Sequence, residues 1–189
     1  MLIRPGFDPT RHDLSLMSNG ELGWIQITNF IVTGLLTIAA AFGIWKVLHD
    51  SPVGTWSPLL IGFYGLGLIG AGIFVADPVN GFPPGTSIET PVITSSGIMH
   101  FVTGGIGFLG FIAACLVFAR RFSLLKEKAW AKFSRVTGFL FFAAFVGIAM
   151  GSQPGSPILS FVTLGFWVAV IVGWTWFSLV IANFRNILT

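Results

Sequence analysis

Side chains that could do chemistry are few in this 189-residue chain, of which only 9% is charged, and they gather in three places. The first is a polar N-terminal segment, the second follows the second of five apolar stretches, and the third begins the next stretch. One amide lies inside the first apolar stretch. The candidate residues for a polar or ligand-binding site are Asp8, Arg11, Asp13, Asn29, Asp77, Asn80 and His100.

These residue types allow several roles. Asp and Asn cap helices and turns, so the cluster could be structural, with His100 paired to a carboxylate. Histidine and carboxylates also bind zinc and similar ions, which makes Asp77 and His100 the candidate metal ligands. Alternatively, His100 carries protons in acid–base catalysis, or the cluster binds a ligand or substrate. The sequence leaves these roles open and indicates no particular cofactor.

Motifs of common enzyme classes are missing from the sequence. It has no His-Glu-x-x-His, no Cys-x-x-Cys, no phosphate-binding glycine loop and no Gly-x-Ser-x-Gly elbow. Cys115 is the single cysteine, so it forms no intrachain disulfide. His12 and His49 fall in polar segments, and we expect both to be solvated.

Five apolar stretches must position the candidate residues. Each approaches the roughly 20 residues that a helix needs to cross a bilayer, and the one charged residue within them is Arg135, at the start of the fourth. Only helices satisfy their own backbone hydrogen bonds in lipid over such lengths. We therefore predict an all-α, polytopic membrane bundle in a single domain, residues 1–189. Its helices are predicted at Trp24–Trp45, Trp56–Ala76, Ile98–Ala119, Ser134–Met150 and Ile158–Ala182.

The basic residues predict an orientation. Eight of the ten lie on one side of the predicted helices and two, Arg4 and Arg11, lie on the other. Cytoplasmic loops are enriched in Lys and Arg, so we expect the N-terminus outside and the C-terminus in the cytoplasm, in the bacterial inner membrane. The eight are Lys46, Arg120, Arg121, Lys126, Lys128, Lys132, Arg135 and Arg185.

Four helical faces bear on packing. His100 shares a face with Thr103, Gly107, Gly110 and Ala114, and small residues allow membrane helices to approach closely, so His100 should point inward. Further small-residue faces occur in the fourth stretch (Ala143, Gly147, Gly151) and the fifth (Gly165, Ala169, Gly173). The first stretch carries a polar stripe, for which we favour interhelical hydrogen bonds over a solvated pathway. Its members are Gln26, Asn29, Thr33 and Thr37.

We expect His100 to find a polar partner because an unpaired, half-buried imidazole costs about 1–3 kcal/mol. Asp77 precedes Pro78, so its helix should end there, near the start of the helix that His100 begins. The prediction is that His100 lies within hydrogen-bond or single-water reach of one of five residues: Asp77, Asn80, Asp8, Arg11 or Asp13.

At these residues the chain resembles a family of bacterial membrane proteins catalogued as domain of unknown function 998 (DUF998). The shared features are Pro5-Gly-Phe-Asp-Pro-Thr-Arg11, Gly23-Trp24, Gly70 to Pro78, Pro84-Gly85, His100 and Phe118-Ala-Arg-Arg-Phe122. The resemblance implies a compact helical bundle, and it does not indicate an activity for this chain. Family members look like six-helix proteins in which the proline–glycine segment follows the first helix, so we expect that helix to be missing here.

The leading functional hypothesis is a non-enzymatic binding or accessory subunit with an outward-facing polar site. The alternatives are a membrane hydrolase, with or without a metal ion, that uses Asp77 and His100, and, third, a small-molecule transporter. Beyond the lipid bilayer, the expected partner is a second copy or another membrane protein that covers the flank of the missing helix. No basic stripe with interleaved aromatic residues lies outside the membrane loops, so we expect no nucleic-acid binding.

Overall fold

The protein is a bundle of five long helices, described by a computed structural model at residues 4–48, 52–88 and 90–188. A short 3-10 helix, η1 (Leu14–Ser18), precedes them, and no β-strand forms within the described residues. Each of the five is long and apolar enough to cross a membrane, which confirms the predicted fold class. The helices are α1 (Gly23–Leu48), α2 (Pro52–Ile73), α3 (Ser95–Leu124), α4 (Lys128–Gly151) and α5 (Leu159–Leu188).

The helix ends depart from the prediction at the charged loop between the third and fourth helices. α3 continues to Leu124 and α4 already begins at Lys128, so both run beyond their apolar stretches. Hydropathy identifies only the part of a helix that is suited to lipid. Arg and Lys are good helix formers, so the helix can continue beyond the lipid into water. α2 ends earlier than predicted, at Ile73 instead of Ala76.

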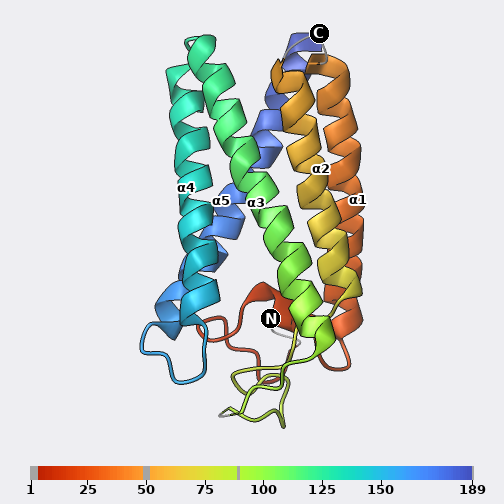
Figure 1. Cartoon of the computed structure of the whole chain (residues 1–189), viewed down its shortest axis with the longest axis vertical. Helices are drawn as coiled ribbons and strands as arrows, with labels where there is room; N and C mark the ends of the chain where they lie inside the picture. Colours follow the sequence, from red (N-terminus) through yellow and green to blue (C-terminus); the bar gives the residue numbers. More distant parts are fainter. Residues whose placement is uncertain (1–3, 49–51, 89, 189) are drawn as a thin grey trace.

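Consecutive helices run up and down and pack against each other, while α5 crosses behind the bundle and touches α1 only sparsely (Figure 1). The two termini lie at opposite ends. We call one end the capped end, because the N-terminal segment and the α2–α3 and α4–α5 connections fold over it. The other, with the tight α3–α4 turn, is the basic end.

Glycines set how closely the first three helices approach. A Cβ atom on Gly34 would lie 2.6 Å from the carbonyl oxygen of Gly65, where α1 crosses α2. A Cβ on Gly67 would lie 2.6 Å from the Cα atom of Gly107, where α2 crosses α3. The predicted small-residue face of α3 is therefore confirmed as a packing face. Gly165 of α5 differs, because its position faces open space.

Aromatic rings fill the region where α3, α4 and α5 meet. Trp176 of α5 is fully buried, and its ring centroid lies 5.4 Å from that of Phe111 and 5.7 Å from that of Phe118. Its indole N–H donates to the hydroxyl of Ser134 on α4 at 2.9 Å. Packing and one buried hydrogen bond thus tie α5 to its neighbours.

Candidate functional site

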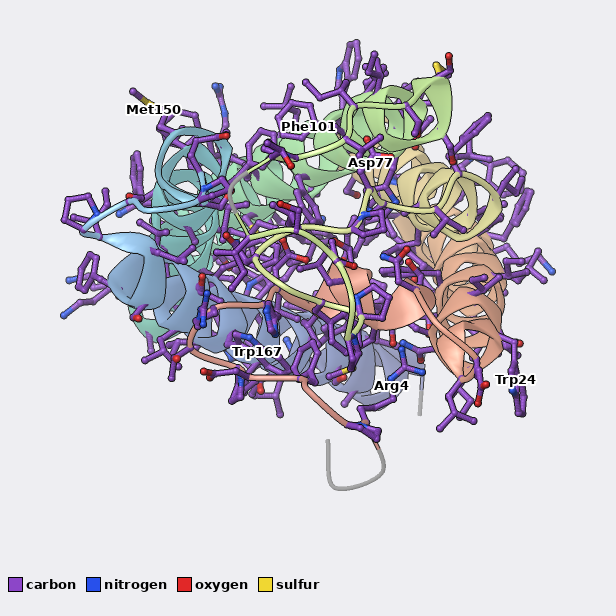
Figure 2. The ribbon with its side chains drawn as sticks, turned by 90° about the horizontal axis from the view of Figure 1, so that it is seen from below. Arg4, Trp24, Asp77, Phe101, Met150 and Trp167 are labelled. Carbon is purple, nitrogen blue, oxygen red and sulfur yellow. The ribbon has the colours of Figure 1, made fainter. Side chains whose placement is uncertain are left out.

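The N-terminal segment is fixed across the capped end by side-chain contacts. The Arg4 guanidinium donates to the carbonyl oxygens of Met17 and Asn19, and the Asn19 amide donates to the carbonyl of Ala76 at 3.0 Å. Trp167 of α5 donates its indole N–H to the carbonyl of His12 at 3.3 Å. Seen from this end, the segment and the α2–α3 connection lie over the centre of the bundle (Figure 2).

His12 is the centre of this cap, and the expectation that it is solvated is wrong. Its side chain is only 3% exposed. Nδ1 accepts from the backbone N–H of Asp8 at 2.9 Å, so Nε2 carries the proton and donates to the carbonyl of Asn80 at 3.0 Å. The polar neighbours in sequence gave no sign that a distant loop would enclose the ring.

Asn80 joins three segments at the capped end. Asn80 and Gly81 both have left-handed backbone angles, with φ of 57° and 84°, as an Asn-Gly pair favours in a tight turn. The turn buries the amide, which donates to the carbonyls of Arg11 and Ser152, each at 3.3 Å. The Asn80 side chain, through the backbone carbonyls of Arg11 and Ser152, therefore holds the cap together.

Two of the three candidate carboxylates, Asp8 and Asp77, stabilise local structure in the cap. The hydroxyl and then the backbone N–H of Thr10 bond to Asp8 and hold the pKa of its carboxyl below the ordinary value. Asp77 accepts from the backbone N–H of Thr94 at 2.9 Å and from its hydroxyl at 2.5 Å. Thr94 in turn caps α3, so Asp77 secures the start of that helix.

His100 points into the bundle as predicted, but its hydrogen bonds differ from the prediction. Nδ1 lies 3.1 Å from the carbonyl oxygen of Ala71 and 2.7 Å from that of Phe74. Carbonyls only accept, so Nδ1 carries the proton. The ring therefore uses the free backbone carbonyls at the end of α2, which side-chain patterns do not display. None of the five expected partners is hydrogen-bonded to His100 within the described residues.

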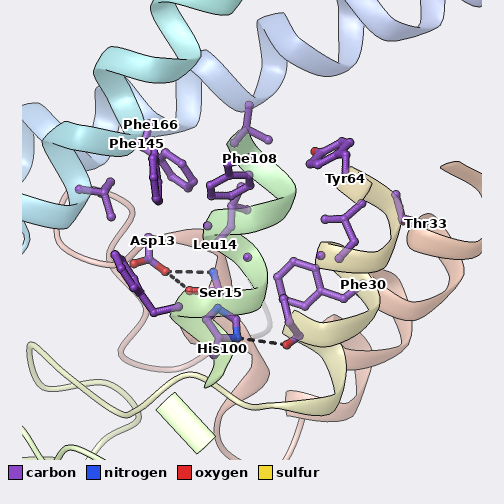
Figure 3. Close-up of a pocket in the computed structure, with 18 of the residues that line it drawn as sticks. Asp13, Leu14, Ser15, Phe30, Thr33, Tyr64, His100, Phe108, Phe145 and Phe166 are labelled. Atoms are coloured by element: carbon purple, nitrogen blue, oxygen red, sulfur yellow. Dashed lines mark hydrogen bonds between the residues drawn. The ribbon is translucent and has the colours of Figure 1, made fainter. Parts of the chain in front are cut away.

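A cavity of about 560 Å³ lies beside His100, and we call it the chamber. Its polar wall includes Asp13, Ser15, Gln26, Asn29, Thr33 and His100. All five helices contribute aromatic or apolar side chains to the remainder, including Phe30, Tyr64, Phe108, Phe145, Phe166 and Trp174. In Figure 3, Asp13, Ser15 and His100 lie below Phe108, Phe145 and Phe166. The chamber is thus polar in one part and aromatic in another.

Comparison with known proteins places the chain in a family. A family model described as "Protein of unknown function (DUF998)" matches residues 1–183. The chain belongs to this family. No curated protein and no solved structure matched the chain.

In this DUF998 protein, three of the seven candidate residues meet at one site. Asp13, Asn29 and His100 all line the chamber. Asp8, Arg11, Asp77 and Asn80 instead belong to the cap around it. Asp77 and His100 take separate hydrogen-bond partners, and no group of three or more His, Cys, Asp or Glu side chains suited to a metal ion occurs in the described part of the chain.

Three members of the polar stripe of α1, Gln26, Asn29 and Thr33, line the chamber, and the expected interhelical hydrogen bonds of the stripe are absent from the described residues. Thr33 donates to the amide oxygen of Asn29 at 3.3 Å, and Thr37 donates to the carbonyl of Thr33 at 2.8 Å. These bonds stay within one helix. The side chains of Asn29 and Gln26 therefore retain polar capacity for a molecule in the chamber.

Sequence reasoning missed most of the chamber of this DUF998 protein. Ser15 lies two residues from Asp13, and its hydroxyl donates to the Asp13 carboxylate at 2.5 Å. That pairing is readable as a local turn signal. The aromatic wall had no such signal, because an apolar side chain that lines a cavity looks the same in sequence as one that faces lipid.

Proposed function

We propose that this protein binds an amphipathic small molecule in the chamber and is a binding protein of the membrane. The observation that supports this proposal is the chamber itself. Its volume lies within the range of about 300–1,000 Å³ typical of small-molecule sites, and it combines an aromatic wall with a few polar groups. An apolar chain or ring of the ligand packs among Phe108, Phe145 and Phe166, while its polar group meets Asp13, Asn29 and His100.

Filling the chamber tests this proposal. Gly104 lines it, and a Cβ atom there would meet no other atom within 4 Å. Gly104→Leu should therefore preserve the fold and occupy space that the ligand needs. We expect at least about a tenfold loss of affinity, equivalent to about 1.4 kcal/mol. The measurement is saturable binding of radiolabelled dodecylamine to the protein in lipid nanodiscs, with empty nanodiscs subtracted.

Gly62→Leu is the matched control for this experiment. Gly62 on α2 also has open space around its Cβ position, and it does not line the chamber. Its leucine variant should bind like the parent protein. Equal affinity of the Gly104 and Gly62 variants would place the binding elsewhere and contradict the proposal.

We propose further that the capped end faces outward, in the inner membrane of a bacterium. Eight Lys and Arg residues belong to the other side and two to this one. A reporter that works only outside the cytoplasm should be active when inserted at residues 86–90 and inactive when fused to Thr189. The opposite pattern of activity would reverse the assignment, and the chamber would then receive its ligand from the cytoplasmic side.

An oligomer or a partner protein along one flank stays a prediction. It is supported by the sparse contact between α1 and α5, which leaves this side of the ring of helices the least closed.

A further inference from the structure

We infer that the chamber selects lipophilic amines: molecules with an apolar chain or ring and a protonated amino group. This inference rests on the proposed function and names the ligand class of the same site. Its first support is charge. Asp13 is the carboxylate in the chamber wall, and no Lys or Arg among the described residues lines it. A phosphate or carboxylate head would have no cation to pair with, whereas an ammonium group would.

The second support is the hydrogen-bonding capacity left in the wall. Oδ1 of Asp13 accepts from the backbone N–H and hydroxyl of Ser15 and from the N–H of Leu16. Its other oxygen, Oδ2, has no hydrogen-bond partner in the described part of the chain. A carboxylate oxygen only accepts, so a ligand group that binds Oδ2 must be a donor.

His100 presents a second free acceptor. Its Nδ1 proton is committed to the carbonyls at the end of α2, so in the neutral imidazole the lone pair lies on Nε2. The two ring nitrogens point to different sides of the imidazole, so Nε2 is turned away from those carbonyls. No hydrogen bond to Nε2 occurs within the described residues. Two acceptors in one wall favour a ligand group with several N–H donors.

The surroundings favour a cation with an apolar tail. By sequence, the segments of the capped end hold five carboxylates and two arginines, so their field attracts positive charge. Phe30 packs near His100, with ring centroids 6.2 Å apart, and aromatic faces attract cations. Beyond it, Phe108 and Phe145 pack at 5.5 Å and offer an apolar surface for the tail.

Three ligands that share the same dodecyl tail separate the contribution of the head group from that of the tail. They are dodecylamine, dodecanol and dodecyl phosphate. Each is measured by saturable binding to the protein in lipid nanodiscs. The parent protein should bind dodecylamine at least about tenfold more tightly than dodecanol, and dodecyl phosphate more weakly than either. Asp13→Asn should lower dodecylamine affinity about tenfold and leave dodecanol affinity within about twofold, since Asn also caps a helix start.

Glu21→Gln is the control, because Glu21 is an exposed carboxylate of the capped end outside the chamber wall. It should leave all three affinities unchanged. Equal affinity of the parent protein for dodecylamine and dodecanol would overturn the inference and leave the proposed function standing. Absence of saturable binding for all three would overturn both. If Asp13→Asn fails to fold, the comparison of the three ligands on the parent protein still decides the inference.

Discussion

Replacing Gly67 with leucine should lower the free energy of unfolding by about 3 kcal/mol or more, at the upper end of the usual cost of overpacking. At this position α2 and α3 touch through their backbones. A Cβ atom on Gly67 would lie 2.6 Å from the Cα of Gly107 and 2.8 Å from the carbonyl oxygen of Thr103. Neither backbone atom can turn aside as a side chain would, so the helices must separate.

Separation of α2 from α3 would also disturb the candidate functional site. The Nδ1 proton of His100 on α3 bonds to the carbonyls of Ala71 in α2 and of Phe74 just beyond it, and both helices line the chamber. The measurement is thermal or denaturant unfolding in detergent, followed by tryptophan fluorescence. Gly62→Leu again serves as the control, because that position is open. Equal stability of the Gly67 and Gly62 variants would show that the helices do not meet as described.

Trp176→Ala should be the most damaging truncation in the helix interior, with a loss of about 3–5 kcal/mol. The indole is fully buried between α3, α4 and α5, so its removal leaves a void in the packing. In lipid, packing contacts supply much of the force between helices, so a void here removes attraction that lipid does not replace. The same unfolding measurement applies.

Two further variants test why the loss of the Trp176 side chain destabilises the protein. Trp176→Phe keeps an aromatic ring and removes the hydrogen bond to Ser134, so it should cost about 1 kcal/mol plus the lost ring volume. Trp24→Ala removes an indole that is 62% exposed in the bundle, and it should change stability little. A loss at Trp24 as large as that at Trp176 would mean that the buried position has no special packing role.

The membrane-spanning elements could be predicted because their cause is local. A run of apolar residues with no charge must form helix in lipid, and Pro and Gly segments mark where it stops. The inward direction of His100 was also readable, since residues three and four apart share a helical face. Small residues at Gly107 and Gly110 marked that face as the one that packs.

Which polar groups meet was decided by the tertiary structure. His12 looked solvated from its neighbours, yet the Asn80 turn, 68 residues away, encloses it. His100 bonds to main-chain carbonyls, whose availability depends on where α2 happens to end. A sequence states which side chains are polar and where along a helix they lie. It does not state which backbone groups a distant helix leaves free.

The sequence by itself determined the five helices, their apolar spans and the concentration of basic residues on one side, because lipid imposes these on each segment separately. The tertiary structure decided the chamber. A cavity arises where the side chains of several helices fail to fill the space between them, and this depends on crossing points set by contacts such as Gly67 with Gly107. Those crossings place Asn29 and His100 in one wall, and the contacts that fix the N-terminal segment add Asp13 to it.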